Sequence, residues 1–217
     1  MPSGAAQADE ARREAILEAT WRLIAERGYH AVRIADIAAV CGTSTGTVHY
    51  YFSGKDDVLT EALKHCVQQA FARQSQELVT IDDAHERLLK LIDMQLPRVG
   101  EIRDEWSIWL QFWAEAAVRP QFRPVHNEYY ARWRETVERI VRRGQRQGVF
   151  TGDADPALTA MKFTALTDGI AIQVLTGAPG MSVTVMRELL VDFVRRELVV
   201  PGDRDQVPAA TAASLPD

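Results

Sequence analysis

The stretch that decides the fold is Ile34–Lys55, IADIAAVCGTSTGTVHYYFSGK. In its first part, apolar residues recur at i, i+3, i+4 and i+7, the spacing of one helix face: Ile34, Ile37, Ala38 and Cys41. Gly42 is expected to end this helix, because glycine readily takes the conformation that closes a helix. A second helix must begin almost at once, with Ser44 or Thr45 as its cap. The stretch therefore predicts two short helices joined by a tight turn.

The second short helix is predicted to keep a polar and aromatic face outside. Its Val48 and Phe52 fall at positions that point inward. The outward positions are Thr45, Gly46, Thr47, His49 and Tyr50. A helix of about nine residues is unstable alone in water, and a glycine within it costs roughly 1 kcal/mol more. A face retained at that cost indicates a surface in use, and its hydroxyl, imidazole and backbone donors suit a DNA groove.

Composition bounds the rest of the chain. At 217 residues, with 47% hydrophobic and 25% charged content, it is long enough to bury a full core. No segment approaches the roughly 18 uncharged apolar residues of a membrane span, and the start, MPSGAAQADEARREAI, carries acids where a signal peptide is apolar. Two cysteines, Cys41 and Cys66, are too few for a disulfide framework and are expected to be reduced, structural thiols. We therefore expect a cytoplasmic globular protein.

The net charge of −5 argues against a protein that coats nucleic acid, because such binding comes mainly from Lys and Arg. The distribution of charge weakens this objection. Basic residues gather near the two short helices, at Arg12, Arg13, Arg22, Arg27, Arg33 and Lys55, and three acids, Asp36, Asp56 and Asp57, offset part of them. A small local contact with DNA is compatible with this arrangement.

Helical periodicity covers almost the whole chain, and strand signals are nearly absent. Beside the two short helices, we expect helices over residues 9–27, 55–78, 84–96, 101–118, 125–147, 156–175 and 183–198. The pattern divides the chain into a three-helix unit over residues 9–54 and a larger helical body over 55–200. The tail, residues 201–217, is expected to be disordered, because it lacks periodicity and is rich in Pro, Ala and Asp.

The order of segments from Ile16 to Leu63 resembles the TetR family of bacterial transcriptional regulators, through the runs GYHAVRIADIAAVCG, STGTVHYYF and GKDDVL. The later segments WSIWLQFWAEAAVRPQFRPVHNEYYARWRE and LTDGIAIQVLTG resemble the C-terminal domain of BetI-like, choline-responsive repressors. The resemblance implies an all-α fold. An N-terminal DNA-binding unit with a helix-turn-helix would be followed by a larger helical domain for ligand binding and dimerisation.

The resemblance also implies roles for residues of the two short helices. The second helix would enter the major groove, with Thr45, Gly46 and His49 at base edges. Arg33 stands where the family often has a capping Thr or Ser, and would replace a hydroxyl contact with a charged one. Two alternatives stay open: Tyr51 packs behind Val48, or Lys55 is only a solvated charge. The full set of predicted DNA contacts is Arg33, Ser44, Thr45, Gly46, Thr47, His49, Tyr50, Tyr51 and Lys55.

An aromatic concentration marks the body, since four of the five tryptophans lie between residues 106 and 133. Such residues form either a packed core or a pocket for a cationic or aromatic ligand, because Trp faces attract cations. Choline-like cations and flat apolar molecules are both hypotheses. Asp168, beside Gly169 in an apolar helix, either contacts the ligand or has a structural role. The predicted ligand contacts are Trp109, Phe112, Trp113, Tyr130, Trp133, Phe163 and Asp168. Trp106, Tyr129 and Met161 are further candidates that could lie beside them.

Nothing in the sequence indicates an enzyme. The five histidines are scattered, and there is no HExxH, CxxC, nucleophile elbow or P-loop. We expect no catalytic residue, no metal and no cofactor.

The last two expected helices carry apolar faces suited to a homodimer. One face holds Val183, Met186, Leu189, Leu190, Phe193 and Val194, and the other holds Leu158, Met161, Leu166, Ile170 and Val174. A two-fold dimer would place its reading helices about 34 Å apart, one DNA turn, and would favour a palindromic operator. The sequence thus favours a repressor released by a small-molecule effector. The alternatives are an activator without such control, or a helical protein-interaction module.

Overall fold

The computed structural model describes residues 4–200, which form nine α-helices and one short 3-10 helix. The tail expected to be disordered, residues 201–217, lies outside the described residues. In chain order the elements are α1 (Gly4–Arg27), α2 (Ile34–Val40), α3 (Thr45–Tyr51), α4 (Lys55–Val79), α5 (Ala84–Gln95), α6 (Glu101–Val118), η1 (Pro120–Phe122), α7 (Arg123–Gln147), α8 (Pro156–Leu175) and α9 (Val183–Glu197). The all-α prediction is confirmed.

The described chain forms two compact units. The first unit contains the chain up to Ala72 together with Asp104–His126. The second unit contains Arg73–Arg103 and the chain from Asn127 onward. Helices α4, α6 and α7 each contain residues of both units. The predicted division at residue 54 stays a prediction.

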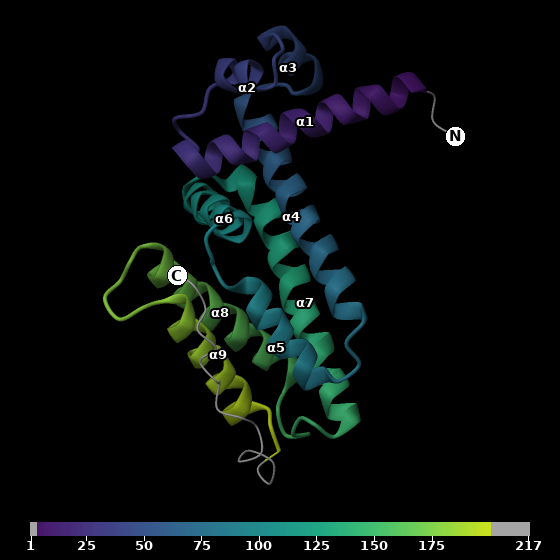
Figure 1. Ribbon diagram of the computed structural model, residues 1–217, viewed down its shortest axis with the longest axis vertical. Coiled ribbons are helices and arrows are strands. Elements are labelled where there is room, and N and C mark those ends of the chain that lie inside the picture. The colour runs from purple at the N-terminus through teal and green to yellow at the C-terminus, as the bar shows by residue number, and fades with distance from the viewer. Residues whose placement is uncertain (1–3, 201–217) are drawn as a thin grey trace. The chain divides into compact units, whose positions relative to one another are not determined.

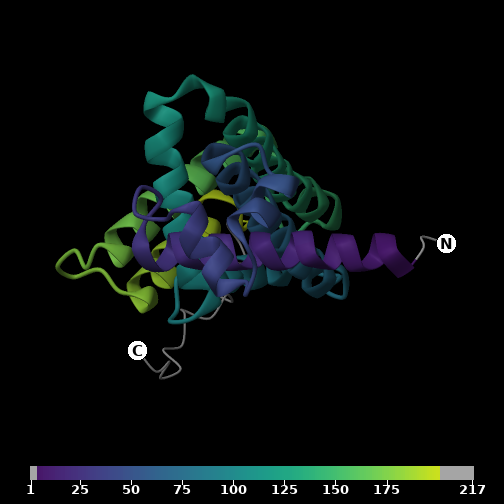
Figure 2. The same cartoon turned by 90° about the horizontal axis from the view of Figure 1, so that it is seen from above.

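In the first unit, α2 and α3 lie together on one side of α1 (Figure 1). Seen from above, they lie beside the C-terminal part of α1, whose first turns extend past them (Figure 2). α1 ends where the sequence predicts, because Gly28 has φ +88°, a conformation that L side chains rarely adopt. α2 ends in the same way at Gly42, with φ +60°. These two endings turn the chain sharply enough to bring both short helices against α1.

In the second unit, α8 and α9 lie side by side, and the loop between them extends away from both helices (Figure 1). Side-chain oxygens cap both helices, because Asp155 accepts from Leu158 N at 2.9 Å and Ser182 accepts from Val185 N at 3.2 Å. The sequence predicts an apolar face on each of these two helices. Several residues of these faces are buried in the chain's own core, among them Ile170, Met186, Leu190 and Val194. The pairing of α8 with α9 therefore uses much of that apolar surface internally.

The expected bounds agree with the structure to within one residue, except at the starts of α1 and α7. α1 begins at Gly4, five residues before the expected start, because residues 5–8, AAQA, are strong helix formers. α7 begins at Arg123, and the short η1 precedes it with Pro120 in its first turn. Within residues 4–200, no helix is both long and apolar enough to cross a membrane.

Candidate functional site

Helix α3 is seven residues long and is held by its cap and by two buried side chains. Ser44 is the cap, since its Oγ accepts from Thr47 N at 3.1 Å. Val48 and Phe52 are buried, with 0% and 2% of their surface exposed. The residues predicted to face outward do so: Thr45, Gly46, His49 and Tyr50 are exposed, and Thr47 is half-buried. Tyr50 is 76% exposed, although its ring lies 4.9 Å from the ring of Tyr51, measured between centroids.

The start of α2 carries a charged group in place of the usual cap. Arg33 is the cap residue and its side chain makes no capping bond. Asp36 supplies the other half of a capping arrangement, because its Oδ2 accepts from Arg33 N at 2.9 Å. The exposed guanidinium of Arg33 is thus left outside the cap at the start of the helix-turn-helix.

Tyr51 and Lys55 both have partners within the chain. The Tyr51 hydroxyl donates to Asp9 Oδ1 at 2.6 Å, and this hydrogen bond raises the pKa of the Tyr51 hydroxyl. Lys55 Nζ donates to His30 O at 3.0 Å and lies 5.6 Å from the centre of the Tyr29 ring. Lys55 is therefore more than a solvated charge in this structure, and Tyr51 is tied to the first turns of α1.

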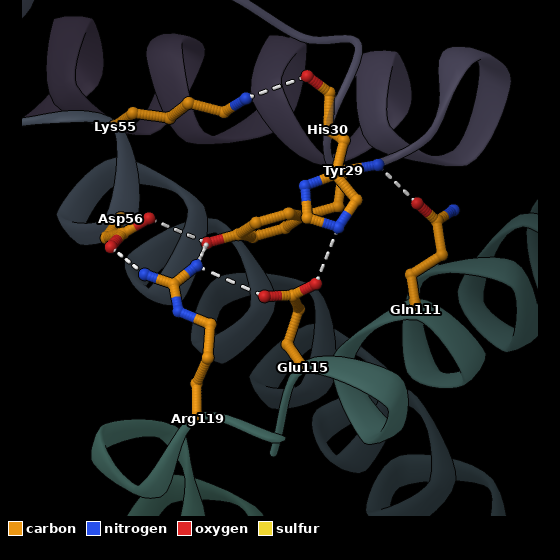
Figure 3. A network of polar contacts seen from close by, with 7 residues as sticks. All are labelled: Tyr29, His30, Lys55, Asp56, Gln111, Glu115 and Arg119. Atoms are coloured by element: carbon orange, nitrogen blue, oxygen red, sulfur yellow. Dashed lines mark hydrogen bonds and ion pairs between the residues drawn. The ribbon is translucent and has the colours of Figure 1, made fainter. Parts of the chain in front are cut away.

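A network of polar contacts joins the loop after α1, the first turn of α4 and the end of α6 (Figure 3). Its centre is Arg119, which forms ion pairs with Asp56 and with Glu115, the latter at 3.1 Å. The same guanidinium donates to the Tyr29 hydroxyl at 3.1 Å, and that hydroxyl donates to Asp56 Oδ1 at 2.8 Å. His30 Nε2 lies 2.9 Å from Glu115 Oε1.

Gln111 adds two further contacts between α6 and the end of α1. Its Nε2 donates to Ile24 O at 2.9 Å, and its Oε1 accepts from Tyr29 N. Both contacts are to backbone groups at a helix end, where N–H and C=O groups need partners outside the helix. Gln111 therefore fixes the position of the chain that leads from α1 into α2.

The network is charged at neutral pH. Burial alone would raise the pKa of the Asp56 carboxyl, but hydrogen bonds from Tyr29 and Arg119 outweigh it and lower that pKa. The hydrogen bond to Asp56 is the main cause that raises the pKa of Arg119. Burial, and then Asp56, raise the pKa of the Tyr29 hydroxyl well above its ordinary value. The result is a neutral phenol held between an anion and a cation.

The α6 aromatic residues form a cluster within the first unit. The Trp113 ring lies 6.3 Å from Trp106 and 6.2 Å from Trp109, measured between centroids. Phe112 is 4% exposed and contacts Phe122 edge to face, which makes it a core residue. Trp113 Nε1 is buried and, among the described residues, has no hydrogen-bond partner. Such a buried donor needs an explanation, and a ligand oxygen is one.

The other predicted ligand contacts lie in the second unit, on α7 and α8. The Tyr130 hydroxyl donates to Asp168, and the Arg134 guanidinium lies 4.8 Å from the centre of the Tyr130 ring. Phe163 is 1% exposed and packs against Trp133 and Phe193. Phe163 is thus core, while Tyr130, Trp133 and Asp168 are half-buried. Met161, a further candidate, is instead 50% exposed.

Comparisons with known proteins identify the family. Residues 84–199 match the family described as BetI-type transcriptional repressor, C-terminal, and residues 16–62 match bacterial regulatory proteins, tetR family. This chain belongs to the TetR family. It is therefore a DNA-binding transcriptional regulator with an N-terminal helix-turn-helix, and the family is not enzymatic.

Individual relatives support the same family. This chain is 52% identical to a transcriptional regulator from Saccharomonospora viridis that was crystallised in complex with choline. The two structures superpose with a TM-score of 0.82, and the match covers 88% of this chain and 98% of the other. It is 29% identical over 168 residues to the regulator PksA of Bacillus subtilis, covering 76% of this chain and 80% of PksA. It is 25% identical over 192 residues to the regulator BetI of Vibrio campbellii, and this match covers 87% of this chain and 93% of BetI.

Sequence reasoning missed most of the polar network in this TetR-family chain. It singled out Lys55, but as a phosphate contact, and it counted Asp56 only as an offsetting charge. Tyr29, Glu115 and Arg119 were not singled out. Tyr29 and Asp56 are 27 positions apart and Asp56 and Arg119 are 63 apart, so no helical spacing connects them. The one available signal was that Gln111, Glu115 and Arg119 recur every four residues, which places polar groups on one side of a helix.

Asp168 gives the second unit a testable pH dependence. Burial raises the pKa of the Asp168 carboxyl to about 7, whereas the pKa of an Asp carboxyl in an unfolded chain is about 4. Between these pH values the folded chain holds a proton that the unfolded chain lacks, so the free energy of unfolding falls as pH rises, by up to about 1.4 kcal/mol per pH unit. We expect Asp168→Asn to lose this contribution and to gain stability relative to wild type as pH rises from about 4 to 7.

Urea unfolding across that pH range measures the effect. The exposed Asp153→Asn is the matched control, and it should follow the wild-type curve. An unchanged difference between wild type and Asp168→Asn at every pH would contradict the raised pKa.

Proposed function

We propose that this chain is a homodimeric repressor that binds a palindromic operator and is released by a small cationic effector of the choline type. The DNA-binding part rests on the face of α3 that holds Thr45, Gly46, His49 and Tyr50, all of which are exposed. Thr45, Gly46 and His49 would read base edges. Arg33, Ser44, Thr47, Tyr50, Tyr51 and Lys55 would contact phosphates, which position the protein on the duplex. Such a protein would act in the bacterial cytoplasm.

A cationic effector is supported by the chemistry of two groups of side chains. In the second unit, Asp168 supplies a half-buried carboxyl that accepts from the Tyr130 hydroxyl, and α7 also carries the half-buried Trp133. In the first unit, Trp109 and Trp113 are half-buried and offer aromatic faces, which attract cations. Phe112 and Phe163 support these rings from the core. The choline complex of the Saccharomonospora viridis regulator, 52% identical, favours a quaternary ammonium over a flat apolar ligand.

A dimer is supported by apolar side chains left exposed on α8 and α9. Leu158, Met161 and Ile172 lie on one side of α8 and are 51%, 50% and 36% exposed, and Leu189 on α9 is 41% exposed. Gly169 lies on the same side of α8 with no atom within 4 Å of an added Cβ, so a second helix could approach closely there. Exposed apolar residues gathered on one face are typical of an interface between copies.

The operator-binding claim can be tested on Gly46. An alanine Cβ there would lie 3.5 Å from Ser44 Oγ, an ordinary contact, so Gly46→Ala should raise the free energy of unfolding by about 1 kcal/mol. The same methyl group would stand between the α3 backbone and the groove. We expect a more stable protein that binds its operator at least about tenfold more weakly.

The measurement is selection of bound sequences from random duplex DNA, followed by titration of the selected operator. Thr45→Ala, His49→Ala and Tyr50→Ala should also weaken binding, and Val79→Ala, exposed in the second unit, is the control. A folded wild-type protein that selects no palindrome would favour the protein-interaction alternative.

The effector claim can be tested with choline and its uncharged carbon isostere, 3,3-dimethylbutan-1-ol. Choline should bind by calorimetry and release the operator, and the isostere should do neither at the same concentration. Asp168→Asn and Trp109→Leu should each weaken choline binding about tenfold. The affinity of the wild type for choline should rise from pH 6 to pH 8, because the carboxylate form of Asp168 attracts the cation. Equal binding of choline and the isostere would exclude recognition of the charge.

A further inference from the structure

The polar network around Arg119 connects the segments that place the two short helices. Tyr29 and His30 lie in the loop that leads from α1 to α2, and Lys55 and Asp56 begin α4, only three residues after α3 ends. Gln111 and Glu115 lie on α6, and Arg119 directly follows the end of that helix. All seven residues belong to the first unit. The point where the chain enters the helix-turn-helix is therefore joined to Gln111 and Glu115 of α6, and the point where it leaves is joined to Arg119, just after α6.

Arg119 is the residue on which the charge balance of this network depends. Its guanidinium lies between two carboxylates in Figure 3, those of Asp56 and Glu115. The Glu115 side chain is only 6% exposed, so its charge needs a partner. His30 reaches Glu115, but its own side chain is 82% exposed, and Lys55 is engaged with the backbone of His30. Without Arg119, two carboxylates would face the Tyr29 hydroxyl with no guanidinium between them.

We propose that Arg119 is a positioning residue for operator binding: through Asp56 and Tyr29 it holds the first turn of α4 and the loop before α2 where α3 can enter the groove. This inference rests on the DNA-binding role proposed for α3. Arginine suits the task, because its planar guanidinium donates in several fixed directions at once and stays charged at all relevant pH values. The network holds the DNA-binding arrangement, and its rupture releases it.

The position of the network on α6 gives it a regulatory consequence. At about 100° per residue, Gln111 and Glu115 point to one side of α6, and Trp109 and Trp113 point to the roughly opposite side. A ligand that shifts α6 by contacting these tryptophans would displace Gln111 and Glu115 on the same helix, together with Arg119, which directly follows the helix end. Effector binding and operator binding would then compete through the contacts of Arg119.

The experiment is a double-mutant cycle on the affinity for the selected operator. Arg119→Gln and Asp56→Asn should each weaken binding about tenfold or more, and the double variant should be no weaker than the weaker single variant. Arg119→Lys, which keeps the charge, should recover part of the loss. Arg139→Gln is the matched control, because Arg139 forms an exposed ion pair with Glu135 on α7. Stoichiometric titration gives the active fraction, so that misfolded protein is not counted as weak binding.

Tyr29→Phe is a milder variant that tests the same network if Arg119→Gln or Asp56→Asn fails to fold. It removes only the hydroxyl that joins Arg119 to Asp56, and it should weaken operator binding about threefold at unchanged active fraction. Operator affinity within about twofold of wild type in Arg119→Gln, Asp56→Asn and Tyr29→Phe would overturn the proposal, as would additive losses or tighter binding. Failure of the wild type to select any sequence would overturn the DNA-binding role itself, which is a separate result.

Discussion

A seven-residue helix cannot hold itself together in water, and the rest of this structure depends on how α3 is nevertheless held. Val48 and Phe52 are nearly all that α3 buries, so its stability comes from neighbouring elements. This division of surface leaves the opposite face bare for another molecule. It also means that small movements of the supporting elements become movements of the exposed face, because α3 has no core of its own to resist them.

The supporting elements meet in one charged network. Gln111 on α6 contacts the end of α1, and Arg119, which directly follows α6, contacts the start of α4. The aromatic residues Trp109 and Trp113 lie on α6, which would therefore be the physical link between the proposed ligand-contacting surface and the segments around α3. Coupling through such a link requires a ligand that binds the two arrangements with different affinity. A rigid helix with different partners on its two sides meets the structural requirement.

Local patterns in the sequence were sufficient to predict the helices and the outward face of α3. Apolar spacing at Ile37 and Val48, with Gly42 between them, determines which side of each short helix is buried. The network could not be predicted, because its contacts join residues 27 and 63 positions apart, and the four-residue spacing of Gln111, Glu115 and Arg119 does not identify their partners. The aromatic residues show the same limit: spacing grouped Phe112 with Trp109, but only packing shows that the first is core and the second half-buried. The two ligand-contact sets also belong to different units, which periodicity does not reveal.

The central claim is that the dimer holds its two reading helices at groove spacing and that the effector changes that spacing. Pulsed electron resonance between spin labels on the two copies tests it most directly, with Val40→Cys labelled after Cys41→Ala and Cys66→Ala. Val40 is 59% exposed at the end of α2, beside α3. The account predicts one narrow inter-label distance that the operator leaves unchanged and that choline shifts. A distance that choline leaves unchanged while it releases the operator, or the absence of any coupling between two copies, would contradict it.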